Sequence, residues 1–168
     1  MIIFQDIFTG DELFSDAYDF RVEVDLFYRV EAEMITVRQN TDIDIGTNAS
    51  AEEVGETLED GMITVNDIIY SFRLRAVSFD KKTYLTHLKG YLQAVKEKLE
   101  ESNPSRAKAF EIDAPAAVKE IMAHFQDYEF YVGESKNPHG AVALLNYEAD
   151  GVTPYFLLWK DGLSEIKV

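Results

Sequence analysis

Acidic side chains are the groups with which this chain could most readily do chemistry, and three of them gather near its start. Asp11, Glu12 and Asp16 follow the first apolar run, and Leu13 and Phe14 stand between them. An acidic turn that exposes apolar groups would suit a basic protein surface. If both apolar side chains fold inward, the same segment is only a solvated turn. The residues alone leave both interpretations open.

A second group of carboxylates lies within residues 39–72, which contain no lysine or arginine. Asp42 and Asp44, with Glu53 at the twelfth place, partly match the ligand spacing of an EF-hand calcium loop. The match fails at the sixth place, where Thr47 replaces the turn glycine. We therefore predict no tight calcium site. Weak calcium binding by clustered carboxylates is the alternative to a non-specific attraction of cations.

Other catalytic and metal-binding patterns are missing from the sequence. The histidines His87, His124 and His139 are scattered, no cysteine supports them, and no HExxH arrangement is present. Phosphate-binding loops, dinucleotide fingerprints and the Gly-x-Ser-x-Gly motif of hydrolases are missing too. We therefore expect a protein that is not an enzyme, without a cofactor and without a specific metal site.

The overall composition narrows the class of protein further. The chain has 168 residues, a net charge of −15 and 46% hydrophobic residues, and this length is most simply one domain, residues 1–168. Since nucleic-acid binding depends on neutralising phosphates, so acidic a chain is not expected to bind nucleic acid directly. The N-terminus lacks the basic region of a secretory signal, and no apolar run reaches the roughly 20 residues that span a bilayer. We expect a cytoplasmic protein without membrane insertion.

Apolar residues alternate with polar ones in several runs, as expected of strands with one buried face. The predicted strands are Ile2–Phe8, Phe20–Val30, Ile68–Ala76, Tyr128–Val132, Val142–Tyr147 and Tyr155–Trp159. Asp150-Gly151 marks a turn between the last two. Residues 39–67 hold few apolar anchors and many carboxylates, which predicts a long mobile acidic loop.

The hydrophobic period changes to three and four residues after Asp80, which predicts a helix that ends near Glu101. Its apolar face consists of Tyr84, Leu88, Tyr91, Leu92, Val95 and Leu99. Gly90 interrupts this helix and suggests a close packing contact. Pro115 marks either the start of a second helix near Asp113 or a break in a longer helix. A short link joins the two helices, so we predict an antiparallel helical hairpin over residues 80–127 and an α+β fold, mainly antiparallel.

A basic stripe runs along the first predicted helix. Lys82, Lys89 and Lys96 repeat every seven residues, nearly opposite the apolar face. We refer to these three residues as the lysine stripe. It is either a solvated face of the helix or a docking surface for an acidic partner.

Four segments, taken in order, resemble the translationally controlled tumour protein family, also called histamine-releasing factor. They are Met1–Phe20 (MIIFQDIFTGDELFSDAYDF), Ile45–Glu53 (IGTNASAEE), Ser78–Pro104 (SFDKKTYLTHLKGYLQAVKEKLEESNP) and Tyr131–Leu163 (YVGESKNPHGAVALLNYEADGVTPYFLLWKDGL). The resemblance implies a folded-over β-sheet core, or β-tent, similar to that of a Rab-binding chaperone of the nucleotide-exchange type, with a projecting helical hairpin. It also implies a cytosolic regulatory or chaperone-like binding protein linked to translation and cell growth.

The resemblance also assigns partners to particular residues. Glu12, beside Asp11 in the GDE segment, corresponds to a glutamate tied to binding small GTPases of the Rheb or Rab type. Glu134, in the YVGES segment, is a second and weaker candidate for the same surface. Microtubule contact is ascribed to the family's helical region, which would make tubulin the acidic partner of the lysine stripe. Weak calcium binding and links to the translation machinery and the cytoskeleton are also ascribed to the family.

Overall fold

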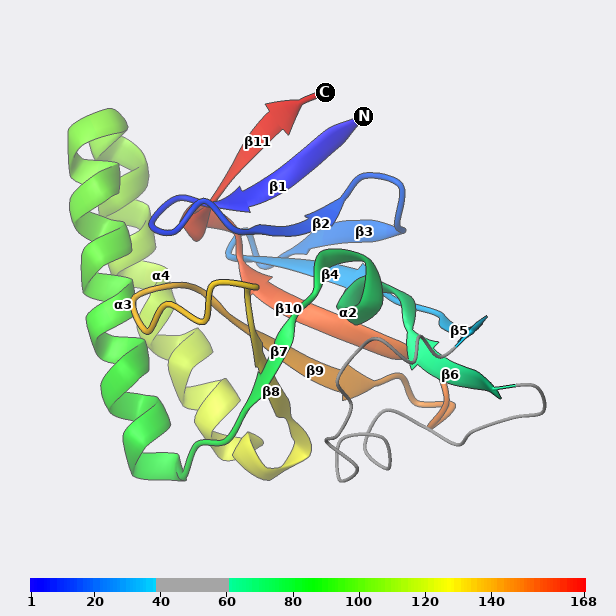
Figure 1. Ribbon diagram of the computed structural model, residues 1–168. Coiled ribbons are helices and arrows are strands. Elements are labelled where there is room, and N and C mark those ends of the chain that lie inside the picture. Colours follow the sequence, from blue (N-terminus) through cyan, green and yellow to red (C-terminus); the bar gives the residue numbers. More distant parts are fainter. Residues whose placement is uncertain (39–60) are drawn as a thin grey trace.

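Antiparallel strand pairing builds the sheets of this protein, and two long helices stand beside them (Figure 1). The computed structural model describes residues 1–38 and 61–168. In chain order, the strands are β1 (Ile2–Asp6), β2 (Glu12–Ser15), β3 (Phe20–Glu23), β4 (Phe27–Glu31), β5 (Met34–Arg38), β6 (Met62–Asn66), β7 (Arg75–Val77), β8 (Glu129–Val132), β9 (Val142–Tyr147), β10 (Pro154–Trp159) and β11 (Leu163–Lys167). The helices are α2 (Asp67–Phe72), α3 (Lys81–Ser102) and α4 (Pro104–Ala123), with short 3-10 turns η2 (Phe125–Asp127) and η3 (Lys160–Gly162).

The strands form three sheets within the described residues. A six-stranded sheet has the order β3-β4-β10-β9-β8-β7, a three-stranded sheet has the order β11-β1-β2, and β5 pairs with β6. Strand β10 lies inside the large sheet, and all six of its residues are buried. Because β1 pairs with β11, the two ends of the chain lie side by side (Figure 1). The predicted α+β class, with mainly antiparallel sheets and a helical hairpin, is confirmed.

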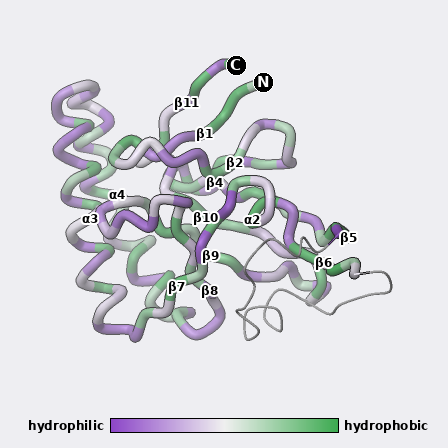
Figure 2. The backbone as a smooth tube through the Cα atoms, in the orientation of Figure 1, coloured by the Kyte–Doolittle hydropathy of each residue, from purple (hydrophilic) through white to green (hydrophobic). Residues whose placement is uncertain are grey.

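The helical hairpin follows the predicted periodicity closely. Asp80 caps α3 by accepting a hydrogen bond of 2.7 Å from the Thr83 N–H. The side chains that α3 buries are Tyr84, Leu88, Tyr91 and Val95, as the three- and four-residue steps predict. Hydrophilic and hydrophobic residues alternate along both long helices (Figure 2), so each helix buries one face against the rest of the protein. No helix among the described residues is long and apolar enough to cross a membrane.

Two details of the hairpin differ from expectation. Of the two alternatives at Pro115, a helix start near Asp113 is wrong. Pro115 lies inside a longer helix, α4, which begins at Pro104 and continues through it to Ala123. Asn103 caps α4 by accepting a hydrogen bond from the Arg106 N–H. The start signal of α4 is therefore the pair Asn103-Pro104, and the cap lies ten residues before Asp113. The expected close contact at Gly90 is also wrong, since a Cβ atom there would meet nothing within 4 Å.

The predicted strand Phe20–Val30 is in fact a hairpin of β3 and β4. The chain reverses at Val24 and Asp25, which have positive φ angles of 45° and 58°. Val22 pairs with Tyr28 across the hairpin, so both side chains lie on one face of the sheet. The period-two pattern therefore continues through the turn, which explains why alternation alone could not detect it.

The prediction of a strand at Ile68–Ala76 is wrong for most of its length. Asn66 accepts hydrogen bonds from the N–H groups of Ile68 and Ile69, and this cap starts the short helix α2. The helix ends at Arg73 in the left-handed conformation, and only β7 remains extended. The predicted loop at 39–67 is also too long, because Met62–Asn66 forms β6. Its remaining part, residues 39–60, lies outside the described residues.

Ion pairs fix the N-terminal end of α4 to the sheet. The Arg106 guanidinium donates to Asp161 of η3 and to Asp25 in the β3–β4 turn. Lys160 pairs with the same aspartate at 3.2 Å. Together, the hydrogen bond from Lys160 and the nearby Arg106 charge lower the pKa of the Asp25 carboxyl. The hairpin is therefore held by charges at its connected end as well as by its apolar face.

Candidate functional site

The turn between β1 and β2 is built around a buried carboxylate. Asp6 is only 3% exposed and accepts hydrogen bonds of 2.8 Å from the Phe8 N–H and 2.7 Å from the Ala141 N–H. Gly10 closes the turn with a φ of 79°, a conformation that favours glycine. The Asp6 carboxylate thus holds the turn closed and also connects it to the distant loop between β8 and β9.

Asp11 makes the second tie between these two segments. Its carboxylate accepts a 2.6 Å hydrogen bond from the Ser135 hydroxyl and faces the Ser135 N–H at 3.4 Å. A Cβ atom at Gly133 would lie 2.4 Å from the same carboxylate, so only glycine fits there. The GDE and YVGES segments, more than 120 residues apart, therefore meet through this carboxylate. Asp11 positions the surface, and its oxygens are already engaged within the chain.

Glu12 and Glu134 lie on either side of this junction, and both are exposed. The Glu134 carboxylate pairs with the Arg73 guanidinium at 3.2 Å, and these side chains are 51% and 71% exposed. Arg73 ends α2 with a φ of 55°, which is uncommon for a residue other than glycine. We call Glu12, Arg73 and Glu134, held by Asp11 and Ser135, the turn surface. It carries two carboxylates and one guanidinium, and within the described residues only Glu134 and Arg73 form an ion pair there.

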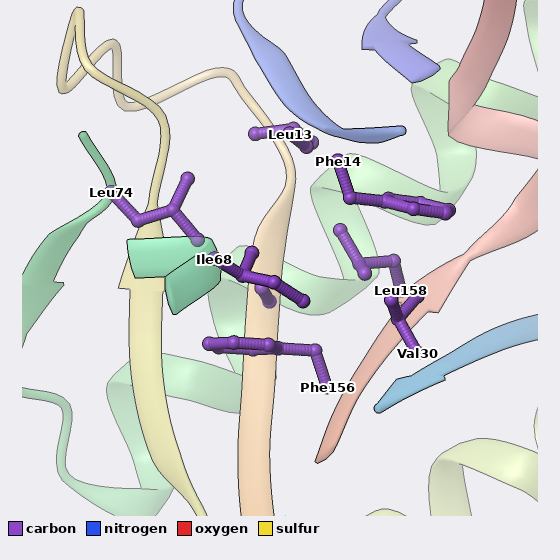
Figure 3. Close-up of a pocket in the computed structure, with 8 residues that line it drawn as sticks. Leu13, Phe14, Val30, Ile68, Leu74, Phe156 and Leu158 are labelled. Atoms are coloured by element: carbon purple, nitrogen blue, oxygen red, sulfur yellow. The ribbon is translucent and has the colours of Figure 1, made fainter. Parts of the chain in front are cut away.

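The apolar residues of the GDELFSD segment do not belong to the turn surface. Leu13 is 3% exposed and Phe14 is fully buried. Phe14 stacks on Phe4 with ring centroids 4.3 Å apart, and Leu13 lies in the core against Ile68 of α2 (Figure 3). Both apolar side chains therefore fold inward, and any partner contact at this turn would have to use its carboxylates. Because β2 is covered by packed elements on both faces, alternation could not predict which side chains are exposed.

Figure 3 shows the core seam beneath the turn surface. Side chains from β2, β4, α2 and β10 converge there, together with residues of β9 and of the connection after α2. The residues that line it are Leu13, Phe14, Val30, Ile68, Leu74, Ala143, Phe156 and Leu158. They leave no room for a water molecule. The seam is a packed core, and it fixes α2 against β2.

The structure divides the lysine stripe into two parts. Lys82 and Lys89 are exposed on α3. Lys96 is instead directed to the other helix, where its ammonium pairs with Glu111 of α4. The hydrogen bond from Glu111 raises the pKa of Lys96. Only the first two residues of the stripe are therefore available to an external partner.

Two sets of residues bear on the prediction of no specific metal site: the three histidines, and the acidic segment with Asp42, Asp44 and Glu53. Among residues 1–38 and 61–168, no group of three or more histidine, aspartate or glutamate side chains could hold a metal ion. His87 contacts the Pro138 carbonyl oxygen at 3.2 Å, and burial lowers its pKa. Asp42, Asp44 and Glu53 lie outside the described residues. Weak calcium binding by that segment stays a prediction.

Sequence reasoning identified the carboxylates of the turn surface but missed the residues that assemble it. Arg73 fell inside a predicted strand, so nothing marked it as a neighbour of Glu134. Gly133 and Ser135 belong to the YVGES segment, and a glycine two residues before a serine in a loop was the available signal. Their pairing with Asp11 is a tertiary contact, which spacing along the chain cannot reveal.

Comparison with known proteins places this architecture in a family. The family model described as translationally controlled tumour protein matches residues 1–164. The chain is 50% identical over 167 residues to the translationally-controlled tumor protein homolog of Schizosaccharomyces pombe, covering 99% of each chain. It is 52% identical over 168 residues to the homolog of Debaryomyces hansenii, covering the whole of both.

Solved structures agree with the sequence comparison. The translationally controlled tumor-associated protein p23fyp of Schizosaccharomyces pombe superimposes with a TM-score of 0.86 at 49% identity, with full coverage of both chains. The Caenorhabditis elegans translationally-controlled tumor protein has the same fold, with a TM-score of 0.74 at 23% identity over 100% of this chain and 99% of that one. The fold is thus the antiparallel β-tent with a helical hairpin. The chain belongs to the translationally controlled tumour protein family, as its four segments predicted.

Proposed function

We propose that the protein is a cytosolic regulatory or chaperone-like binding protein, not an enzyme, that contacts small GTPases of the Rheb or Rab type through Glu12. The observation that carries this proposal is the junction between Asp11 and Ser135. It holds the β1–β2 turn and the β8–β9 loop together and leaves the neighbouring carboxylate of Glu12 exposed. Through such contacts the protein would support translation and growth.

The electrostatics of the turn surface favour a basic contact on the partner. Glu134 is partly neutralised by Arg73, whereas Glu12 has no ion pair among the described residues. Because the backbone of Glu12 is held in β2, binding would have to order only its side chain, which preserves more of the interaction energy for affinity. A charged group that becomes desolvated at an interface contributes about 2–5 kcal/mol when its partner is left unpaired by mutation.

Affinity capture of a purified Rheb-type GTPase tests this proposal. Immobilised wild-type protein is expected to retain the GTPase, and Glu12→Val to retain less than about one tenth as much. Glu101→Val, which removes another exposed carboxylate at the end of α3, is the matched control and is expected to behave as wild type. Equal loss in both variants would point to net charge and would contradict a specific site at Glu12.

A second candidate function is tubulin binding through the helical hairpin. Lys82 and Lys89 are exposed, and they form a local basic surface on a protein of net charge −15. Tubulin is acidic, so any contact would need such a local surface to overcome the repulsion between net charges. This proposal uses residues of α3, whereas the GTPase contact uses Glu12 of β2, and the two can therefore be separated by mutation.

A further inference from the structure

A binding surface made only of exposed charges is weak, because solvent screens each pair. The residues that dominate protein interfaces are most often tryptophan, tyrosine and arginine. Leu13 and Phe14 would have been the apolar groups nearest to Glu12, but both are buried. The turn surface therefore needs an apolar group from another element if it is to bind tightly.

The short helix α2 is the element packed directly against the turn surface. Its Ile68 is 1% exposed and lies in the same seam as Leu13 and Phe14 of β2 (Figure 3). The Asn66 cap at one end and the buried Leu74 just beyond the other fix the helix in place. The backbone of α2 is consequently fixed against β2, the strand that carries Glu12.

Tyr70 is the aromatic residue on the outer face of α2. It follows Ile68 by two positions, which is about 200° around a helix of 3.6 residues per turn. Its side chain is thus directed away from the seam, and the residue is 52% exposed. Within residues 1–38 and 61–168, its ring and hydroxyl make no aromatic contact or hydrogen bond. Such a large half-exposed ring, with no partner in the described part of the chain, is an available anchor.

A chain of contacts connects Tyr70 to the carboxylates of the turn surface. Arg73 follows it by three positions as the C-cap of α2, where its backbone N–H still bonds the Ile69 carbonyl oxygen, so the backbones of the two residues lie about one helical turn apart. The guanidinium of Arg73 pairs with Glu134, whose neighbour Ser135 donates to Asp11. Tyr70 is thus one helical turn before the residue whose guanidinium reaches Glu134, and the Ser135–Asp11 junction links Glu134 to the turn that carries Glu12.

We propose that Tyr70 is the aromatic anchor of the partner-binding surface, with Arg73 beside it as a second contact. The partner would present an apolar recess for the ring next to a basic group for Glu12. This inference rests on the proposed GTPase function and adds the apolar contact that the acidic turn lacks. It also specifies the surface expected of the partner, in which an apolar recess lies beside a basic group.

Calorimetric titration of a Rheb-type GTPase into purified variants tests this anchor. Tyr70→Ser is expected to weaken binding at least about tenfold, as for a central aromatic contact. Tyr147→Ser is the matched control, because Tyr147 is also exposed, at 43%, but lies at the end of β9. The control is expected to bind as wild type. Both variants are expected to melt within about 2 °C of wild type, since surface changes have small effects on stability.

The outcomes separate the anchor from the function on which it rests. If wild type binds and Tyr70→Ser binds equally well, the anchor is wrong and the GTPase contact at Glu12 still stands. If wild type itself does not bind, the proposed function fails, and the anchor fails with it. If Tyr147→Ser weakens binding as much as Tyr70→Ser, the ring of Tyr70 has no special role and the assignment is overturned.

Discussion

The neighbouring carboxylates Asp11 and Glu12 and the lysine stripe are both groups of like charges that lie close together along the chain, yet the fold treats the members of each group differently. In the turn, Asp11 is engaged by Ser135 while its neighbour Glu12 is left exposed. On α3, Lys96 is engaged by Glu111 while Lys82 and Lys89 are left exposed. In each group, one member holds two elements together and the others face solvent. The charged side chains available to a partner are those that are not already engaged in ion pairs or hydrogen bonds within the chain.

The two regions also differ in how they are supported. The turn surface stands on a seam without internal space, in which α2 is fixed against β2. The lysine stripe lies on a hairpin that is attached by one apolar face and by the ion pairs of Arg106. We therefore expect the first region to give a rigid contact and the second a weaker contact that depends on salt.

The largest effect on stability is expected at the apolar face of the hairpin. Leu88 is 2% exposed, so Leu88→Ala removes buried methyl groups and leaves a cavity. The free energy of unfolding should fall by roughly 2–5 kcal/mol in urea denaturation. Leu85→Ala, on the same helix but only partly buried, is the control and should cost less. A loss below about 0.5 kcal/mol for Leu88→Ala would mean that the hairpin is not packed as described.

A smaller effect is expected at the junction of the turn surface. Gly133→Ala places a methyl group against the Asp11 carboxylate, so either the loop or the turn must move. We expect a loss of about 1–3 kcal/mol in the free energy of unfolding, together with weaker GTPase capture. Gly90→Ala is the control, because a Cβ atom there meets nothing within 4 Å, and it should not lower stability. If Gly133→Ala were as stable as wild type, the contact with Asp11 would not be tight.

The smallest effect on the fold is expected at the lysine stripe, where the change should appear only in binding. The double variant Lys82→Glu with Lys89→Glu should lose microtubule co-sedimentation and keep GTPase capture. Lys108→Glu with Lys119→Glu makes the same charge change at exposed positions of α4 and should sediment as wild type. If the first variant sediments as wild type, the stripe is only a solvated face. The same follows if sedimentation persists at about 0.5 M salt, where the Debye length is roughly 4 Å.

The sequence was sufficient for the parts of the fold that depend on local pattern. The four segments identified the family, and the periodicity of α3 predicted its buried residues. The β3–β4 turn at Val24 and Asp25 was missed because cross-strand pairing kept the alternation in phase. The helix α2 was missed because six residues are too few to show a helical period, and its Asn66 cap was the only local signal.

The candidate site could be predicted only in part, for a different physical reason. Glu12 and Glu134 were identified from the segments that carry them. The engagement of Asp11 by Ser135, of Glu134 by Arg73 and of Lys96 by Glu111 depends on contacts between distant elements. The tertiary structure therefore decides which of several neighbouring charged side chains has no ion pair or hydrogen bond within the described residues. Tyr70 was read as part of a strand, so its exposure on a helix was not foreseen.

The central claim is that Asp11 positions the surface while Glu12 makes the contact, and a paired measurement on Asp11→Ala and Glu12→Ala tests it most directly. Urea denaturation and calorimetric titration of a Rheb-type GTPase would be run on both variants. Asp11→Ala should lose about 1–3 kcal/mol of stability, because the Ser135 donors are left without their acceptor, and should bind weakly as a consequence. Glu12→Ala should keep its stability within about 0.5 kcal/mol and bind at least tenfold more weakly. The claim is contradicted if Glu12→Ala binds as wild type, or if its stability falls as far as that of Asp11→Ala.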